Sequence, residues 1–308
     1  MKTTLTILAF LIIALPGYSQ FNIQRNSEPD PETDAMSQQF FNGLNPNDVY
    51  GLSSSGAGDV NGDGYDDIIA GASGYNLGQG RAYIYYGGNN MNSVPDVILS
   101  GEAAGNNFGY SVSAAGDVNG DGYADVIVGA NSYSSSAGRV YIYFGGALMN
   151  NVADVIITGG ASGDNLGFSV SKAGDVNGDG FGDVIVGATG HTSNTGKSFI
   201  YFGGAVMNNI ADVTLNGEAS NNNFGSSVSD AGDVNGDGFS DVIVGAKNFN
   251  SGFGKCYVYY GGAVMNNTAD VTMTGLISFG NLGYSVSGAG DINGDNFDDV
   301  IISSFPML

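Results

Sequence analysis

The sequence predicts an all-β protein: a β-propeller made of four-stranded antiparallel blades with a 58-residue repeat. The first observation is the string A-G-D-V-N-G-D-G, whose first Asp recurs at 59, 117, 175 and 233. A fifth, related string, DINGD, begins at Asp291. The second observation is that short runs rich in β-branched and aromatic residues alternate with Gly, Asn, Ser and Asp, while no window shows a helical period of adequate length.

The unit that begins at Phe108 illustrates the four strands. Residues 108–117 alternate in short steps and predict strand one, and the apolar run 125–130 predicts a second strand buried on both faces. Residues 139–146, rich in Val, Ile, Tyr and Phe, predict strand three, and residues 154–159 predict strand four. A β-solenoid is excluded because its rung is much shorter than this repeat.

The repeat divides residues 38–308 into blade units. They are four full units and a partial fifth: about 44–101, 102–159, 160–217, 218–275 and 276–308. The fifth unit stops before its third strand, so we interpret the chain as a fragment or a truncated gene product. Residues 38–43 (QQFFNG) match strand four in register, and we expect them to join the last blade as an outer strand and close the ring.

The N-terminus is typical of a secretory signal peptide over residues 1–19. It has Lys2, an apolar stretch from Leu5 to Leu15 that is too short to span a bilayer, and small residues before a cut at Gln20. We expect residues 20–37 to be a flexible leader. The protein is therefore expected to be secreted or displayed at the surface of a bacterial cell, with no membrane insertion.

The charge of the chain excludes several partners. The formal net charge is −22, with 8 Lys and Arg against 30 Asp and Glu, so nucleic acid and anionic membranes are poor partners and a cation is the obvious one. The single cysteine, Cys256, excludes a disulfide framework and a zinc site built from cysteines.

The repeated acidic loop, D-x-N-x-D-G-x-x-D, predicts a calcium site. Calcium prefers six to eight oxygen ligands, which side chains at positions 1, 3, 5 and 9 and the carbonyl of position 7 would supply. Position 6 must adopt a positive φ, and it is Gly in four loops and Asn296 in the fifth. Up to five Ca²⁺ ions are predicted, with these ligands: Asp59, Asn61, Asp63, Tyr65, Asp67; Asp117, Asn119, Asp121, Tyr123, Asp125; Asp175, Asn177, Asp179, Phe181, Asp183; Asp233, Asn235, Asp237, Phe239, Asp241; Asp291, Asn293, Asp295, Phe297, Asp299.

Three other interpretations of this loop are an EF-hand, a magnesium site and an acidic turn without metal. An EF-hand needs Glu at position 12, but this position holds an apolar residue inside a predicted strand, such as Ala70 or Val128. Magnesium fits less well, because it demands octahedral geometry and keeps its waters. An acidic β-turn without metal stays open for a single loop, but five loops in one register argue against it.

The combination of Phe108-Gly109, the loop from Asp117 to Asp125, and Gly129-Ala130 resembles the FG-GAP repeat, found in the propeller of integrin α chains and in bacterial secreted proteins. The resemblance covers residues 38–304. It implies a four-stranded blade with calcium in the hairpin between the first two strands, in a ring that usually has seven blades.

Other polar or reactive residues have mainly structural interpretations. His191 has no partner at a catalytic spacing, and Cys256 occupies a strand position that is Ala, Val or Ser in the other units. Asp66 and Asp298 are interpreted as solvated. One cation per unit follows a Gly, and it is either solvated or paired with a carboxylate such as Asp96, Asp154, Asp212 or Asp270; these cations are Arg81, Arg139, Lys197 and Lys255.

Two classes of function remain. The first is a binding, adhesion or surface-organising module for protein or glycan ligands, without enzymatic activity. The alternative is the propeller scaffold of an extracellular hydrolase or lyase whose catalytic residues lie outside this sequence. We favour the first, because no acid–base pair or histidine cluster is evident, although a fold alone does not decide between them.

Overall fold

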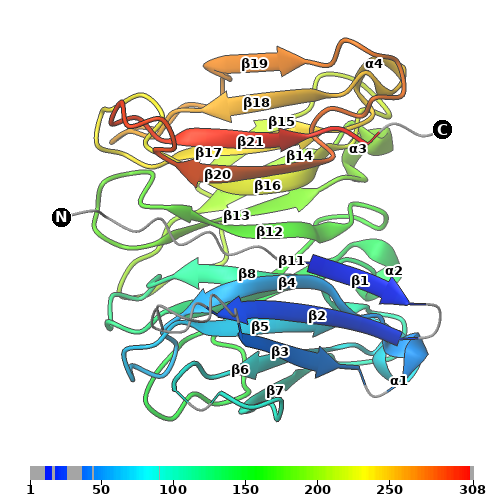
Figure 1. The fold of residues 1–308 in the computed structure, drawn as a ribbon. Helices are drawn as coiled ribbons and strands as arrows, with labels where there is room; N and C mark the ends of the chain where they lie inside the picture. The colour runs from blue at the N-terminus through cyan, green and yellow to red at the C-terminus, as the bar shows by residue number, and fades with distance from the viewer. Residues whose placement is uncertain (1–10, 16–17, 26–36, 44, 90, 306–308) are drawn as a thin grey trace.

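The computed structural model describes residues 11–15, 18–25, 37–43, 45–89 and 91–305. It confirms the all-β architecture and the four-stranded units (Figure 1). The first blade is a four-stranded antiparallel sheet in which each strand pairs with the next one along the chain. Its strands are β4 (Tyr50–Gly58), β5 (Asp67–Ala72), β6 (Arg81–Tyr85) and β7 (Val97–Ser100).

The next three blades repeat this order, and the fifth repeat unit forms a sheet of two strands. The bounds are β8 (Phe108–Gly116), β9 (Asp125–Ala130), β10 (Arg139–Tyr143) and β11 (Val155–Thr158); β12 (Leu166–Gly174), β13 (Asp183–Ala188), β14 (Lys197–Tyr201) and β15 (Val213–Asn216); β16 (Phe224–Gly232), β17 (Asp241–Ala246), β18 (Lys255–Tyr259) and β19 (Val271–Thr274); and β20 (Ser285–Gly290) and β21 (Asp299–Ser303).

The second strand of each full blade is the most deeply buried. Every residue of β5, β9, β13 and β17 is buried, as the continuous apolar runs predict for a strand covered on both faces. Four of the five hydrophobic clusters of the described residues join two neighbouring units, and the fifth joins β3 to the first blade. Phe108, for example, is fully buried beside Leu99 of the first blade, and its ring lies edge-on to that of Tyr141 at 5.1 Å. Burial between blades therefore holds the units together.

The first strands of the five units lie side by side in chain order, from β4 through β8, β12 and β16 to β20. They curl around a cavity of about 910 Å³, to which the first and the fifth unit both contribute. One register position of each first strand lines this cavity, and it is a serine in every unit: Ser55, Ser113, Ser171, Ser229 and Ser287.

Each full blade presents two different ends. At one end lie the acidic loops and the connections between strands three and four. At the other end lie the connections between blades and four short turns, α1 (Tyr75–Gly78), α2 (Tyr133–Ser136), α3 (His191–Asn194) and α4 (Phe249–Gly252). These turns contain residues with positive φ and are not regular helices. In Figure 1 the turns lie on the right and the acidic loops on the left.

The N-terminal strands correct two expectations. β3 (Ser37–Asn42) pairs with β2 (Tyr18–Arg25), which pairs with β1 (Leu11–Leu15); β3 does not join the last blade. Residues 20–25 of the expected flexible leader are thus part of a strand. The physical reason is that β3 finds an edge partner close in sequence, and Phe41 is buried against Tyr85 of the first blade, with ring centroids 4.6 Å apart.

Much of the predicted signal peptide, including residues 1–10 and 16–17, lies outside the described residues. The signal peptide and its cleavage stay predictions. Between Asn45 and β4 the chain forms one turn of 3₁₀ helix, η1 (Pro46–Asp48). No helix in the described part of the chain is long and apolar enough to cross a membrane.

Candidate metal centre

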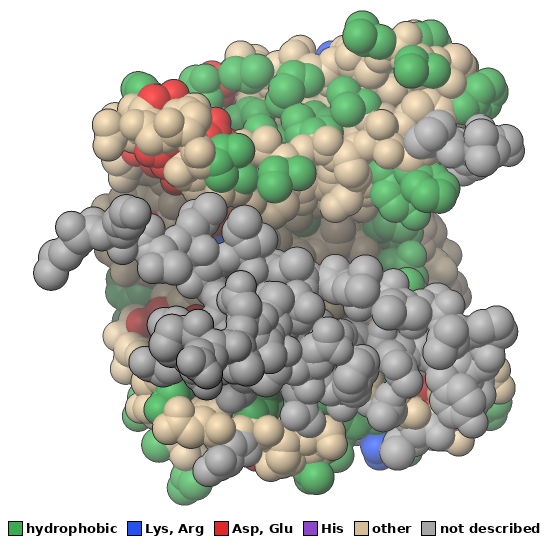
Figure 2. Space-filling view, in the orientation of Figure 1, with side chains coloured by type: hydrophobic (Ala, Val, Ile, Leu, Met, Phe, Trp, Pro, Cys, Tyr) green, Lys and Arg blue, Asp and Glu red, His purple; other side chains and the backbone are tan. Residues whose placement is uncertain are grey.

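The acidic loops join strands one and two of every unit and lie at one end of the molecule. Acidic atoms gather at the left of Figure 2, on the side where Figure 1 shows these loops. In the first loop, Asp59 at position 1 orders the turn. Its Oδ1 accepts the backbone N–H groups of Gly62 and Asp63 at 2.7 and 3.0 Å, and its Oδ2 accepts that of Gly64 at 2.8 Å.

Positions 3 and 5 of the loop are hydrogen-bonded to each other. The Asn61 side chain accepts the backbone N–H of Asp63 at 2.8 Å and donates its amide to Asp63 Oδ2 at 3.0 Å. Asp63 Oδ1 in turn accepts the backbone N–H of Tyr65 at 3.0 Å. The carboxylates are therefore oriented by backbone amides, as side chains that ligate metals are in many proteins.

Position 9 is different, because this aspartate is buried. Asp67 is fully buried, and its two oxygens accept the backbone N–H groups of Val60 at 2.9 Å and Gly87 at 2.6 Å. Burial raises the pKa of the Asp67 carboxyl to about 6 and that of Asp125 to about 7, against the lowering effect of these hydrogen bonds. The aspartate thus ties the start of the loop to the end of strand three.

These bonds explain the Gly-Gly pair that follows strand three of each full blade, such as Gly87-Gly88, a role that the sequence interpretation missed. The landmark glycine lies against the backbone that precedes Asp67: a Cβ on Gly87 would overlap the carbonyl oxygen of Asp66. The signal in the sequence is that this glycine recurs at the same 58-residue interval as the acidic loop. It does so at Gly87, Gly145, Gly203 and Gly261, all of which donate to position 9.

The turn at position 6 has the predicted left-handed conformation in all five loops. Its φ is +89° at Gly64, and Asn296, which replaces glycine in the fifth loop, has φ +70°. Position 12 lies inside the second strand, which confirms that these loops are not EF-hands.

The hydrogen bonds of the first loop recur around Asp117, Asp175, Asp233 and Asp291. The fifth loop has fewer bonds at position 9: Asp299 accepts the backbone N–H of Ile292 at 3.0 Å, and no described third strand follows to supply a second donor. The five loops are therefore one structure repeated, with the last one tied at fewer points.

Neighbouring loops also contact each other. The carbonyl oxygen of Asp59 accepts the backbone N–H of Ala124 at 3.0 Å, and that of Val60 accepts the backbone N–H of Gly146 at 2.8 Å. Gly62 lies against the ring of Tyr123, the position 7 residue of the next loop, so closely that a Cβ there would collide with it. An ordered loop therefore supports the loop of the following blade.

The chemistry of the loop fits a hard cation. Within the described residues, no three Asp, Glu, His or Cys side chains form a ready metal cluster, so the ligands would have to move closer together around an ion. The donor set is nevertheless suitable, since Asp59, Asp63 and Asp67 together keep lone pairs beyond those that the amides use. None of the ion pairs found among the described residues involves these carboxylates, so backbone N–H dipoles are what compensates their charge.

None of the ion pairs among the described residues joins one of the four cations to the aspartate considered for it. Asp154 accepts the backbone N–H of Phe144 at 2.8 Å, at the end of β10, whereas Arg139 lies at the start of that strand. The Arg139 guanidinium instead lies 2.6 Å from Glu102, in the connection from the preceding blade, and 3.7 Å above the ring of Tyr133. Lys255 pairs with Glu218 in the same way, at 2.6 Å.

The remaining candidates have structural surroundings. Cys256 is fully buried, and burial raises the pKa of its thiol to about 12. His191 is partly exposed, and its Nδ1 lies 2.6 Å from the hydroxyl of Thr192. Asp298 is not simply solvated, because its Oδ2 accepts the backbone N–H of Asp233 in the preceding loop at 2.8 Å.

Comparison with known proteins agrees with this architecture. The FG-GAP repeat matches residues 51–85, 108–143, 166–202 and 224–264. The chain is 44% identical over 77 residues to integrin alpha-6 of Gallus gallus, covering 24% of this chain and 7% of that protein. It is 36% identical over 99 residues to integrin alpha-5 of Xenopus laevis, covering 30% and 9%.

The chain thus spans less than a tenth of the length of these curated relatives. Among solved structures, the chain matches a neuraminidase-like protein from A/bat/Guatemala/164/2009 with 11% identity and a TM-score of 0.43. The match covers 95% of this chain and 83% of that one.

Proposed function

Because this chain is an FG-GAP repeat protein related to integrin alpha chains, we propose that it is a secreted, calcium-binding propeller that serves as a binding or adhesion module for protein or glycan ligands. The observation that carries the calcium part is the repetition of one acidic loop in five units, in a single register and with the same internal hydrogen bonds.

The proposed ligands are the residues at positions 1, 3, 5, 7 and 9 of each loop. A bound calcium ion would supply the positive charge that the three carboxylates of a loop lack. Asp117, for example, already accepts the backbone N–H groups of Gly120, Asp121 and Gly122, so the protein orients the carboxylate before an ion arrives. Ordering a loop in this way would also order its contacts with the next blade.

The binding part of the proposal rests on the arrangement of the two ends. The acidic loops occupy one end of every blade, which leaves the connections between blades and the turns α1–α4 as the surface for a ligand. Connecting segments on a rigid scaffold are where proteins usually place binding residues. The signal-like N-terminus supports a location outside the cell, where calcium is plentiful.

Calcium titration of the metal-free chain tests the proposal. We expect several ions per chain, with dissociation constants of about 10⁻⁴–10⁻³ M, as in other extracellular modules. The melting temperature should rise by many degrees between excess chelator and millimolar calcium, because an ion that binds only the folded state stabilises it by mass action. Identical melting curves in calcium and in chelator would refute the calcium site.

A further inference from the structure

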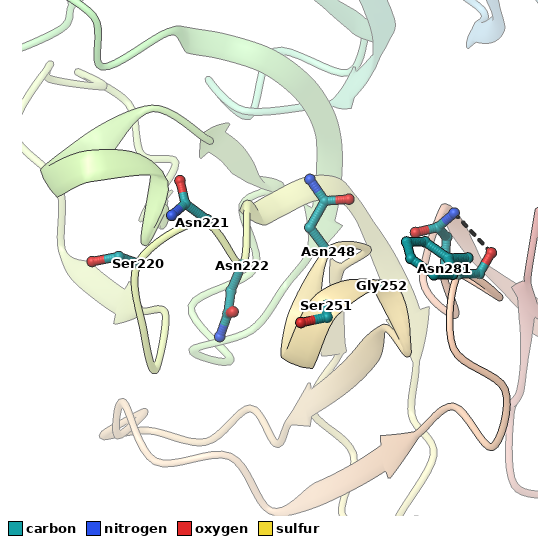
Figure 3. Close-up of a pocket in the computed structure, with 8 residues that line it drawn as sticks. Ser220, Asn221, Asn222, Asn248, Ser251, Gly252 and Asn281 are labelled. Carbon is teal, nitrogen blue, oxygen red and sulfur yellow. Dashed lines mark hydrogen bonds between the residues drawn. The ribbon is translucent and has the colours of Figure 1, made fainter. Parts of the chain in front are cut away.

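A pocket of about 490 Å³ lies at the end of the fourth blade opposite the acidic loops (Figure 3). Three separate segments form it: the connection that enters the blade, the turn after β17, and the connection that leaves the blade. The side chains that matter below are Asn221, Asn222, Asn248, Ser251, Phe279 and Asn281. The volume is in the range of sites that hold small ligands.

The lining of this pocket carries no charged side chain, although the chain as a whole is strongly acidic. Its polar groups are amides and hydroxyls, which offer donors and acceptors together. A charged ligand would find no counter-charge here. A ligand with several hydroxyl groups, each of which both donates and accepts, would match the lining.

Several of these polar groups have unused hydrogen-bonding capacity. Asn222 is 6% exposed, and its side-chain amide makes no hydrogen bond with another described residue. Asn248 donates its amide to Asn223 at 2.7 Å, and Asn281 donates to the carbonyl of Phe305 at 3.0 Å, while no described residue donates to the Oδ1 of either side chain. In Figure 3 the Ser251 hydroxyl is directed toward Asn222. Polar atoms that line a pocket without a protein partner are free to bond to water or to a ligand.

Phe279 at the rim of the pocket breaks the pattern of the repeat. Its φ is +61°, in the left-handed region that a bulky side chain rarely adopts. The same register position holds Gly105, Gly163 and Asn221, residues that tolerate this conformation. The Phe279 ring is also 60% exposed. A strained and exposed aromatic side chain beside a polar pocket indicates a functional rather than a structural choice.

We propose that this pocket binds a neutral saccharide, with the amides hydrogen-bonding the sugar hydroxyls and the Phe279 ring packing against the apolar face of the sugar. The inference rests on the proposed binding function and names its ligand class. Phe279 and Asn222 are the residues that should decide binding, the first through its exposed ring and the second through its unpaired amide.

Two substitutions taken from the other units test the pocket. Phe279→Asn introduces the residue found at position 221, which is compatible with the left-handed backbone, and Asn222→Asp introduces the residue found at position 164. His191→Ala, on α3 of the preceding blade, is the matched control. The full chain, loaded with calcium, is titrated calorimetrically with neutral mono- and disaccharides of glucose, galactose, mannose and N-acetylglucosamine. Glucuronic acid and a neutral tripeptide amide are included for comparison.

We expect at least one neutral saccharide to bind, and both pocket variants to weaken this binding at least tenfold while the control leaves it unchanged. The melting temperature of Phe279→Asn should equal or exceed that of the unsubstituted chain, which separates a lost contact from a folding defect. The inference is overturned if no neutral saccharide binds, if only the acid or the peptide binds, or if the pocket variants bind normally. If the melting temperature still depends on calcium in these cases, the proposed calcium module stands and only the pocket proposal fails. If the melting temperature does not depend on calcium, that result counts against the calcium module and not against the pocket.

Discussion

Gly129 in β9 lies directly against the backbone of Gly167, which belongs to β12 in the next blade. A Cβ built on Gly129 would overlap the carbonyl oxygen of Gly167, and Gly167 itself has φ +80°. The Ser111 hydroxyl donates to that same carbonyl at 2.8 Å. The contact repeats between every two neighbouring units, at Gly71 and Gly109, Gly187 and Gly225, and Gly245 and Gly283. The glycine of the Gly-Ala pair in one blade and the glycine near the start of the next unit's first strand are therefore far apart in the sequence but in direct contact.

Substitution of this glycine should loosen the propeller. We expect Gly129→Ala to lower the free energy of unfolding by at least about 2 kcal/mol, because the added methyl group would push two blades apart. Urea denaturation followed by circular dichroism measures the change. Gly56→Ala is the matched control, since nothing lies within 4 Å of a Cβ at that position of β4. Equal effects of the two substitutions would contradict the contact.

Asp179→Asn should have different effects with and without calcium. Asparagine keeps an oxygen acceptor for the backbone N–H of Phe181, but it loses the acceptor for the Asn177 side-chain amide and removes one of the three charges in the loop. In chelator the melting temperature of the variant should change little, since the relieved repulsion offsets the lost hydrogen bond. In calcium it should melt at a lower temperature and bind one ion fewer.

His191→Ala is the control for this comparison, because His191 lies in a turn at the opposite end of the same blade. Its melting temperature should be unchanged in both conditions. If Asp179→Asn lowers the melting temperature equally in calcium and in chelator, the aspartate is a structural residue and not a calcium ligand.

Glu102→Gln should weaken the attachment of the second blade. Glu102 Oε1 lies 2.6 Å from Arg139 and accepts the hydroxyl of Tyr141 at 2.8 Å, so one carboxylate joins the inter-blade connection to β10. Glu102 is 44% exposed, and solvent screening limits the expected loss of stability to about 1 kcal/mol. Thermal denaturation at low and high salt checks this, because the difference between the two chains should shrink as salt is added. A difference that does not depend on salt would argue against the ion pair as its cause.

Cys256 should be unreactive in the folded protein. Its thiol is fully buried in β18, and burial raises its pKa to about 12, so very little thiolate exists at neutral pH and no reagent reaches it. Labelling with a thiol reagent should follow the opening of the fourth blade, and calcium should slow it by stabilising the folded state. Rapid labelling in the presence of calcium would show that this strand is accessible.

The sequence by itself determined the repeat, the four strands of each blade and the conformation of the acidic turns. These features are local: alternation and β-branched residues decide strands, and the steric freedom of Gly64 or the tolerance of Asn296 decides a positive φ. An exact step between landmarks also shows that the same local structure recurs. For the same reason the sequence predicted which residues share each acidic loop, while their role as calcium ligands stays a prediction.

Only the tertiary structure decided which segments meet. β3 pairs with β2 instead of the last blade, Arg139 pairs with Glu102 instead of Asp154, and Gly129 meets Gly167 across a blade boundary. The spacing between the two positions of each contact does not by itself indicate that they meet. They depend on how sheets twist and stack, and on which edge or charge lies nearest once the blades have packed, because burial and geometry, not adjacency in sequence, select the partner.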